Sequence, residues 1–285
     1  MYKIMTAGPT QVRENVRMAR SLETTNPDLD VAFCEFYKET CDLLQELLHS
    51  SGTAYILGGE GILGLEAACA SLTEPGDRVL VLDNGIFGKG FADFAKMYGG
   101  EPVLFTSDYQ KPIDAAELRD FLEKDSDFKY ATVVHCDTPS GVINDVSVIC
   151  PMLAEFGILS VVDSVAGMFG EYVNVDESQI DILCGGSQKA LSAPAGLTML
   201  WVSDKAMAAM ENRKTPIAAF YANILTFKTY YEDKWFPYTM PISDINGLRV
   251  AVDNVKAEPD IVERHAKIAA ATRQAVRKAG LSLYL

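Results

Sequence analysis

Between residues 53 and 202 the chain alternates short apolar runs with amphipathic stretches, and this alternation restricts its fold more than any other feature. Each run has the length of one buried strand, and most stretches between them have the spacing of a helix that buries one face. The pattern predicts an α/β fold, a mostly parallel seven-stranded sheet with helices on both faces. The seven runs are TAYIL (53–57), RVLVLD (78–83), PVLF (102–105), YATVVH (130–135), ILSVVD (158–163), DILCG (181–185) and LTMLWV (197–202).

Helical patterns also lie outside this region. Residues 31–49 carry apolar side chains at three- and four-residue steps, which is typical of an amphipathic helix. Residues 243–279 predict two helices separated at Glu258-Pro259, because proline disfavours helix continuation. The final residues, GLSLYL (280–285), have the pattern of a first strand of a further unit that the sequence does not include.

Charge and hydropathy exclude several function classes. The chain has 25 Lys and Arg against 39 Asp and Glu, and a net charge of −14 argues against a general binder of nucleic acid or anionic membranes. No apolar run approaches the ~18–20 residues of a membrane span, and the N-terminus lacks the pattern of a secretory signal. We therefore expect a cytoplasmic protein. Its six cysteines are scattered without a C-x-x-C pair, so reduced thiols and no metal site are expected.

A glycine-rich turn lies between the first apolar run and a helix-like stretch. Residues 59–64, GEGILG, form a G-x-G-x-x-G, a pattern that presents backbone N–H groups at a helix N-terminus to a phosphate. Because Asp83 closes the next run, an NAD-dependent dehydrogenase is one interpretation. However, the motif begins about 58 residues into the chain, after a helix, whereas the dinucleotide fingerprint normally opens its domain. This position disfavours NAD.

Two charged residues follow neighbouring predicted strands, at the sheet edge where parallel sheets bind ligands. Asp163 ends ILSVVD, and Lys189 follows DILCG within a stretch of small residues. A lysine in an apolar setting is a usable amine nucleophile, and a buried aspartate is suited to hold a protonated ring nitrogen. Together with a phosphate turn, these groups are what pyridoxal 5′-phosphate (PLP) requires.

Five motifs in this order make the sequence similar to the class V, fold-type I, PLP-dependent aminotransferases. The likeness is strongest to their alanine–glyoxylate and serine–pyruvate branch. It extends from residue 6 to about 255, and the combination of motifs is far more specific than any one of them. The motifs are GGEGILGLEAA (58–68), DNGIFG (83–88), HCDTPSGV (135–142), VVDSVAGMFG (161–170) and GSQKALSAPAGL (186–197).

The resemblance implies catalytic and ring-binding roles. Lys189 would bind the cofactor aldehyde as a Schiff base and then act as the base that moves the proton. Asp163 would pair with the pyridine nitrogen. Phe87 would stack on the ring, and Thr138 would hydrogen-bond its phenolic oxygen.

The resemblance also implies a phosphate site. Gly61 and Ile62 would offer backbone N–H groups to the phosphate, with the side chain of Gln188 beside them. Thr239, in FPYTMP, matches a position through which a second subunit reaches the phosphate. A homodimer with shared active sites is therefore expected.

Three positions depart from the family pattern. Phe236 stands where many members have a phosphate-binding tyrosine, so one contact is absent or replaced. Glu60 stands where a serine or threonine is usual, and we expect its carboxylate to face away from a phosphate. The segment TTNPDLD (24–30) does not match the usual His-Arg segment, which bears on substrate specificity.

The expected organisation has three parts. Residues 1–20 would form an irregular segment and residues 21–242 the large PLP-binding domain. Residues 243–285 would form connecting helices and only the beginning of a small domain. The resemblance implies a substrate-carboxylate arginine in that domain, so we expect either that this arginine is missing or that the sequence is part of a longer protein.

We therefore predict a PLP-dependent aminotransferase that moves an amino group from a small amino acid, such as alanine or serine, to glyoxylate or pyruvate by ping-pong steps. Other class V transaminases, with phosphonate, ureidoglycine or aspartate donors, remain alternatives. A lyase such as a cysteine desulfurase is disfavoured because such enzymes need a reactive cysteine in a later loop, and no cysteine follows Cys184. A non-catalytic domain that keeps the fold is a further alternative.

Overall fold

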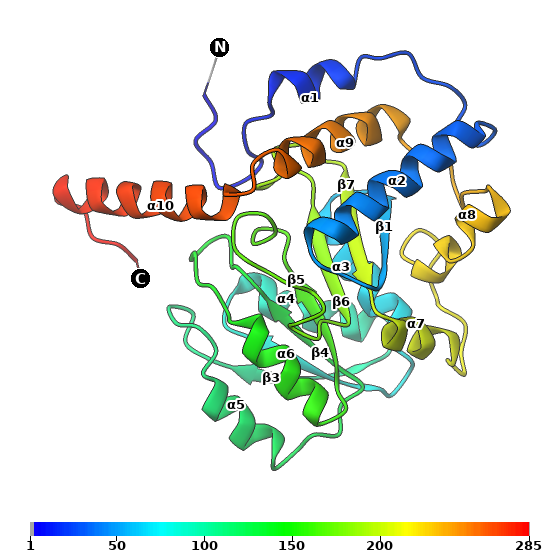
Figure 1. Ribbon diagram of the computed structural model, residues 1–285. Helices are drawn as coiled ribbons and strands as arrows, with labels where there is room; N and C mark the ends of the chain where they lie inside the picture. The colour runs from blue at the N-terminus through cyan, green and yellow to red at the C-terminus, as the bar shows by residue number, and fades with distance from the viewer. Residues whose placement is uncertain (1–2, 285) are drawn as a thin grey trace.

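The computed structural model describes residues 3–284 and contains one seven-stranded sheet (Figure 1). Every apolar run expected to be a strand forms one, which confirms the α/β prediction. The strands are β1 (Thr53–Gly58), β2 (Arg78–Asp83), β3 (Glu101–Thr106), β4 (Tyr130–Val134), β5 (Leu159–Asp163), β6 (Ile182–Gly186) and β7 (Leu197–Val202).

The strand order is β1-β7-β6-β5-β4-β2-β3. Only β7 runs antiparallel to its neighbours, β1 and β6, while the pairs from β6 to β3 are parallel. Five central strands are buried along nearly their whole length, and the edge strand β3 is partly exposed. Near-continuous apolar runs are what a sheet covered on both faces requires. The carboxyl ends of the parallel strands therefore meet at one edge.

Helices cover the sheet on both faces (Figure 1), and α2, α9 and α10 lie where the sequence predicted helices at 31–49 and 243–279. The boundary expected at Glu258-Pro259 is confirmed, because it lies between α9 and α10. The helices are α1 (Glu14–Ala19), α2 (Val31–Leu47), α3 (Gly61–Leu72), α4 (Ile86–Met97), α5 (Ala115–Leu122), α6 (Val146–Glu155), α7 (Asp204–Glu211), α8 (Tyr230–Asp233), α9 (Ile242–Lys256) and α10 (Ile261–Lys278), with a short 3-10 helix at Ile224–Phe227.

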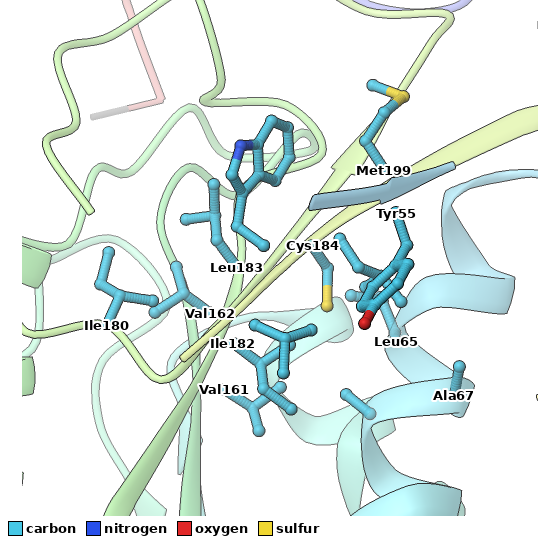
Figure 2. Packing of buried hydrophobic residues seen from close by; sticks show 14 of the residues in the cluster. Tyr55, Leu65, Ala67, Val161, Val162, Ile180, Ile182, Leu183, Cys184 and Met199 are labelled. Atoms are coloured by element: carbon cyan, nitrogen blue, oxygen red, sulfur yellow. The ribbon is translucent and has the colours of Figure 1, made fainter. Parts of the chain in front are cut away.

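One part of the core lies between the sheet and helix α3, which is buried along most of its length. Figure 2 shows side chains of α3, such as Leu65, together with those of β5 and β6, such as Val161 and Cys184. The last glycine of the G-x-G-x-x-G permits this approach, because a Cβ atom on Gly64 would lie 2.4 Å from the Oγ1 of Thr198. Part of the glycine motif thus serves helix packing.

The two ends of the chain differ in their packing. Helix α1, which lies in the segment expected to be irregular, packs against α9 through an Arg20–Asp244 ion pair. Helix α10 extends away from the sheet, and Ile261 is its one buried residue (Figure 1). The expected domain boundaries stay a prediction.

The strand expected at GLSLYL is wrong for residues 281–284, which have no regular secondary structure. A strand is stable only when its N–H and C=O groups pair with a neighbour, and no strand of the described chain pairs with this segment. None of the helices between residues 3 and 284 is long and apolar enough to cross a membrane.

Candidate active site

A cavity of about 390 Å³ lies at the carboxyl ends of the strands. Six of the eight predicted cofactor-binding residues line it, although they come from five separate segments of the chain. The sheet topology brings these segments together, because each follows the end of a strand or opens the next helix. The six residues are Ile62, Phe87, Thr138, Asp163, Gln188 and Lys189.

Lys189 lies in the loop between β6 and β7, and its Nζ donates to the Oγ1 of Thr138 over 3.2 Å. The N-terminal segment holds this loop. The backbone N–H of Thr10 donates to the carbonyl of Gln188 (2.9 Å), and its hydroxyl donates to the carbonyl of Lys189 (2.7 Å). Gly8 lies so close to the lysine side chain that a Cβ atom there would be 2.4 Å from the Cδ of Lys189. The amine is therefore held between Thr138 and the N-terminal segment.

Asp163 is the last residue of β5 and is only 6% exposed. Burial raises the pKa of its carboxyl to about 6, while the N–H of Val165, which donates to Oδ1 over 2.9 Å, and the charge of Lys189 oppose that rise. Glu60 raises the pKa further by charge repulsion. A buried carboxylate near a cation in a cavity is typical of a functional site.

A rigid polar layer lies behind Asp163. The backbone N–H of His135 donates to the carbonyl of Asp163 (2.8 Å), and the Nδ1 of His135 lies 3.0 Å from the Oγ of Ser164. Burial lowers the pKa of His135 to about 4, so the imidazole is neutral at pH 7. This layer fixes the end of β5 without adding a charge.

Thr138 and Phe87 lie on two further sides of the cavity. Thr138 belongs to a tight turn in which Asp137 accepts hydrogen bonds from the N–H and the hydroxyl of Ser140 (3.1 and 2.7 Å). Phe87 lies in the first turn of α4 and is 38% exposed. We call Lys189, Asp163, Thr138 and Phe87 the ring end of the cavity.

A second group of lining residues, Glu60, Ile62 and Gln188, is joined by hydrogen bonds at the N-terminus of α3, and we call it the α3 end. Glu60 is the N-cap of α3, and its Oε2 accepts the backbone N–H of Ile62 over 3.0 Å. Its Oε1 accepts a hydrogen bond from the Nε2 of Gln188, whose side chain is 4% exposed. Our expectation that the Glu60 side chain faces away from the cavity is therefore wrong. Capping the first turn of α3 satisfies a backbone donor, and this draws the carboxylate to the helix N-terminus.

Two predicted phosphate contacts lie elsewhere in this chain. Thr239 is exposed, and its hydroxyl donates to Asp28 over 2.8 Å. Phe236 is buried in an aromatic cluster with Phe33, Tyr37 and Tyr230, at ring distances of 4.9–5.7 Å. Neither residue lines the cavity. The predicted contact of Thr239 with a second subunit stays a prediction.

PLP fits one end of this cavity and not the other. The ring end offers an amine, a buried carboxylate, a hydroxyl and an aromatic side chain, which are the groups that a pyridine ring with an aldehyde requires. At the α3 end, the N–H of Ile62 and the amide of Gln188, both expected to donate to the phosphate, already donate to Glu60. Gly61 opens α3 between these groups, and its predicted contact is untested.

Sequence reasoning missed several residues of the cavity. Gly8 and Pro9 come from the N-terminal segment, and Val165 and Ala166 follow Asp163. The GP pair and the VVDSVAG motif were visible in the sequence, but apolar and glycine residues carry no chemical signal of their own. Ala195 and Cys136 also line the cavity. Burial raises the pKa of the Cys136 thiol to about 11, so this group is a protonated thiol at pH 7.

Known proteins resemble the whole chain. It is 37% identical over 283 residues to the pyridoxamine–pyruvate transaminase of Mesorhizobium japonicum, covering 98% of this chain and 72% of that protein. The solved pyridoxamine–pyruvate aminotransferase of Mesorhizobium loti has a TM-score of 0.91 at 35% identity, over 97% of this chain and 71% of that one. The ureidoglycine–glyoxylate aminotransferase of Bacillus subtilis has a TM-score of 0.95 at 29% identity, over 99% and 73%.

A family model, aminotransferase class V, matches residues 25–279. This match covers the turn at the α3 end and the lysine loop, and it excludes the NAD-dependent alternative. The chain belongs to the class V aminotransferases, PLP-dependent enzymes of fold type I, and it is a transaminase.

Proposed function

We propose that this chain transfers an amino group from a small donor to a 2-oxo acid such as pyruvate or glyoxylate, in ping-pong order. The observation that carries the proposal is the convergence of Lys189, Thr138 and buried Asp163 on one cavity, with 3.2 Å between the Nζ of Lys189 and the Oγ1 of Thr138. The two acceptors are those in the names of the relatives with 37% and 29% identity.

The bound ring would supply an aldehyde that accepts the amino group and an electron sink for the charge that develops on the donor carbon. The Nζ of Lys189 would attack the aldehyde carbon and later take the proton from the donor carbon. Asp163 would hold a proton on the ring nitrogen, because a carboxylate beside that nitrogen favours its cationic form. Thr138 would donate to the ring's phenolic oxygen, and Phe87 would cover one ring face and limit access of water.

Two kinds of amino donor are candidates. Alanine and serine are the donors expected from the family resemblance. Pyridoxamine is the second candidate, since it is the donor in the name of the relative with 37% identity. Glu60 supports this second candidate, because its carboxylate accepts the N–H of Ile62, one of the donors expected for a phosphate.

A cytoplasmic homodimer remains part of the proposal. Several large apolar side chains near the cavity are exposed in the single chain, including Ile62 (42%), Ile86 (65%) and Phe87 (38%). Exposed apolar groups of this kind are typical of a surface that another molecule covers. A second copy would cover them and would bring its Thr239 near the α3 end.

Spectroscopy with an amino-donor panel tests the proposal. Wild-type protein mixed with pyridoxal or PLP should give an absorbance band that borohydride bleaches, and alanine or pyridoxamine with an oxo acid should give the transaminated products. Lys189→Ala should lose the band and lower turnover by at least about 10³-fold, because the attacking amine is gone. Lys205→Ala, at an exposed lysine on α7, is the matched control and should behave as wild type. A bleachable band that persists in Lys189→Ala would contradict the role of this lysine.

A further inference from the structure

The α3 end of the cavity is occupied by a fixed carboxylate of the chain itself. Both oxygens of Glu60 accept hydrogen bonds, one from the backbone N–H of Ile62 and one from the amide of Gln188. Two donors hold the side chain in one orientation, although the residue is exposed at the rim of the cavity. Glu60 is therefore a constant feature of this end of the site.

A phosphate dianion is poorly matched to these surroundings. Helix N-termini bind phosphates because their free N–H groups and the helix dipole favour negative charge. Here the carboxylate of Glu60 offsets that charge and accepts the N–H of Ile62. Among the residues that line the cavity, two carry acidic groups, Glu60 and Asp163, and Lys189 is the one cation. A dianion would thus add to a cavity that already has an excess of negative charge.

A neutral hydroxyl group, in contrast to a phosphate, is well matched to the carboxylate of Glu60. A carboxylate only accepts hydrogen bonds, so a hydroxymethyl group that donates to Glu60 would satisfy both partners. Hydrogen bonds in which the acceptor is ionised are stronger than those between neutral groups. The Oε1 of Gln188, a buried acceptor without a hydrogen-bond partner in the described chain, is a second polar group at this end.

We propose that Glu60 makes the α3 end select a vitamin B6 ring that carries a neutral hydroxymethyl group over one that carries a phosphate. This inference rests on the proposed function, because the ring end must bind the same ring. A ring without phosphate has fewer contacts to hold it and is a substrate that exchanges with solvent. The ring and the oxo acid must then be bound together, so the ping-pong order applies only to amino-acid donors. In that case the aminomethyl carbon is oxidised to the aldehyde while the oxo acid is reduced to the amino acid. The carbonyl oxygen of the oxo acid leaves as water when its carbon bonds to the nitrogen, and a water molecule later supplies the oxygen of the aldehyde as the ring carbon releases the nitrogen. The oxo acid is the oxidant, so no other oxidant is needed.

Binding measurements without turnover test the inference. We would titrate the full chain with pyridoxal and separately with PLP, and measure the dissociation constants from the absorbance of the lysine adduct. Wild type should bind pyridoxal at least about tenfold more tightly than PLP. Glu60→Ser, which keeps an N-cap side chain for α3, should shift the ratio of the two constants by about 100-fold toward PLP. Glu60→Gln, which removes the charge and keeps an acceptor for Ile62, should lie between them.

Glu123→Ser is the control, because it removes an exposed carboxylate at the end of α5, and it should keep the wild-type ratio. A second test uses wild type alone, so it does not depend on whether the Glu60 variants fold. Adding 50 mM inorganic phosphate should leave the affinity of wild type for pyridoxal unchanged. Tighter binding of PLP by wild type, an unchanged ratio in Glu60→Ser, or competition by phosphate would each overturn the inference. If the selectivity is as expected but neither ring supports amino transfer, the proposed function fails and the inference stands.

Discussion

The two ends of the cavity differ in how closely they follow the family pattern. At the ring end, Lys189, Asp163 and Thr138 match the motifs and lie together in the structure. At the α3 end, Glu60 takes the hydrogen bonds expected for a phosphate. The comparison teaches that the groups that act on the reacting carbon and the groups that retain the ring are separate, so one set can change while the other is kept.

The two ends are nevertheless coupled by charge. Burial is the main cause of the raised pKa of Asp163, and the repulsion from Glu60 adds to it. Lys189 acts in the opposite direction. A change at the α3 end therefore alters the protonation of the ring end without any direct contact. Substitutions at each end, taken one at a time, separate these effects.

Among substitutions that keep the amine of Lys189, the largest effect on turnover is expected at Asp163. Asp163→Asn should lower turnover by at least about 10²-fold because the ring nitrogen loses its anionic partner. The same change should alter the pH dependence of stability in the protein without a bound ring. The pKa of Asp163 is about 6 in the folded chain and 3.8 in the unfolded chain. The contribution of this carboxyl to the unfolding free energy of wild type is therefore largest below pH 3.8. Wild type should lose up to about 3 kcal/mol as the pH rises from about 4 to 6.

Urea unfolding of both proteins at pH 4, 5, 6 and 7 measures this loss. The difference in unfolding free energy between Asp163→Asn and wild type should move in favour of the variant as the pH rises. A difference that is constant with pH would show that folding does not raise the pKa of this carboxyl. Asp127→Asn, at an exposed aspartate, is the control and should follow wild type.

A smaller effect is expected at Gly8, which approaches the ring end from the N-terminal segment. A Cβ atom in Gly8→Ala would lie 2.4 Å from the Cδ of Lys189, so the flexible lysine side chain must move. We expect adduct formation with pyridoxal to slow by about tenfold, which is ~1.4 kcal/mol in the barrier, while the ratio of pyridoxal to PLP affinity stays the same.

Stopped-flow absorbance measures this rate. Gly90→Ala is the matched control, because no atom lies within 4 Å of its added Cβ and the substitution should only favour helix α4. If Gly8→Ala changed the ratio of pyridoxal to PLP affinity, the ring end and the α3 end would not act independently in binding.

Much of the fold was predictable from the sequence, because the local apolar pattern of each run matches the burial of its strand in the sheet. Each of the seven apolar runs forms a strand, since a strand buried on both faces must be apolar throughout. The residues at the strand ends, such as Asp163 and Lys189, meet because parallel strands end at one edge. Residues 281–284 do not form the expected strand because their pattern is local, whereas a strand also needs a partner.

The site was less predictable for side chains on which two interactions act in opposite directions, such as repulsion from a phosphate and attraction to backbone N–H groups. Glu60 was expected to avoid the cavity on the basis of its charge alone, but the N–H groups at the start of α3 attract its carboxylate. The approach of Gly8 to Lys189 depends on residues 181 positions apart in the chain. No local pattern encodes such a contact.

The smallest effect on binding is expected at Phe236. This position tests whether a second residue, besides Glu60, accounts for the difference between the α3 end and the family's phosphate site. A tyrosine at this position would restore the family pattern, but the ring of Phe236 is 4% exposed and packs 4.9 Å from that of Tyr37. In Phe236→Tyr the new hydroxyl would be buried among aromatic rings at a cost of about 1–2 kcal/mol in unfolding free energy. The affinity for PLP should remain within twofold of wild type.

Urea unfolding and the absorbance titration with PLP measure the two quantities in the same samples. Phe220→Tyr, at an exposed ring, should change neither by more than about 0.5 kcal/mol. If Phe236→Tyr instead raised the affinity for PLP by tenfold, position 236 would reach the phosphate in the assembled enzyme. Two residues, Glu60 and Phe236, would then account for the difference between this phosphate site and that of the family, rather than Glu60 alone.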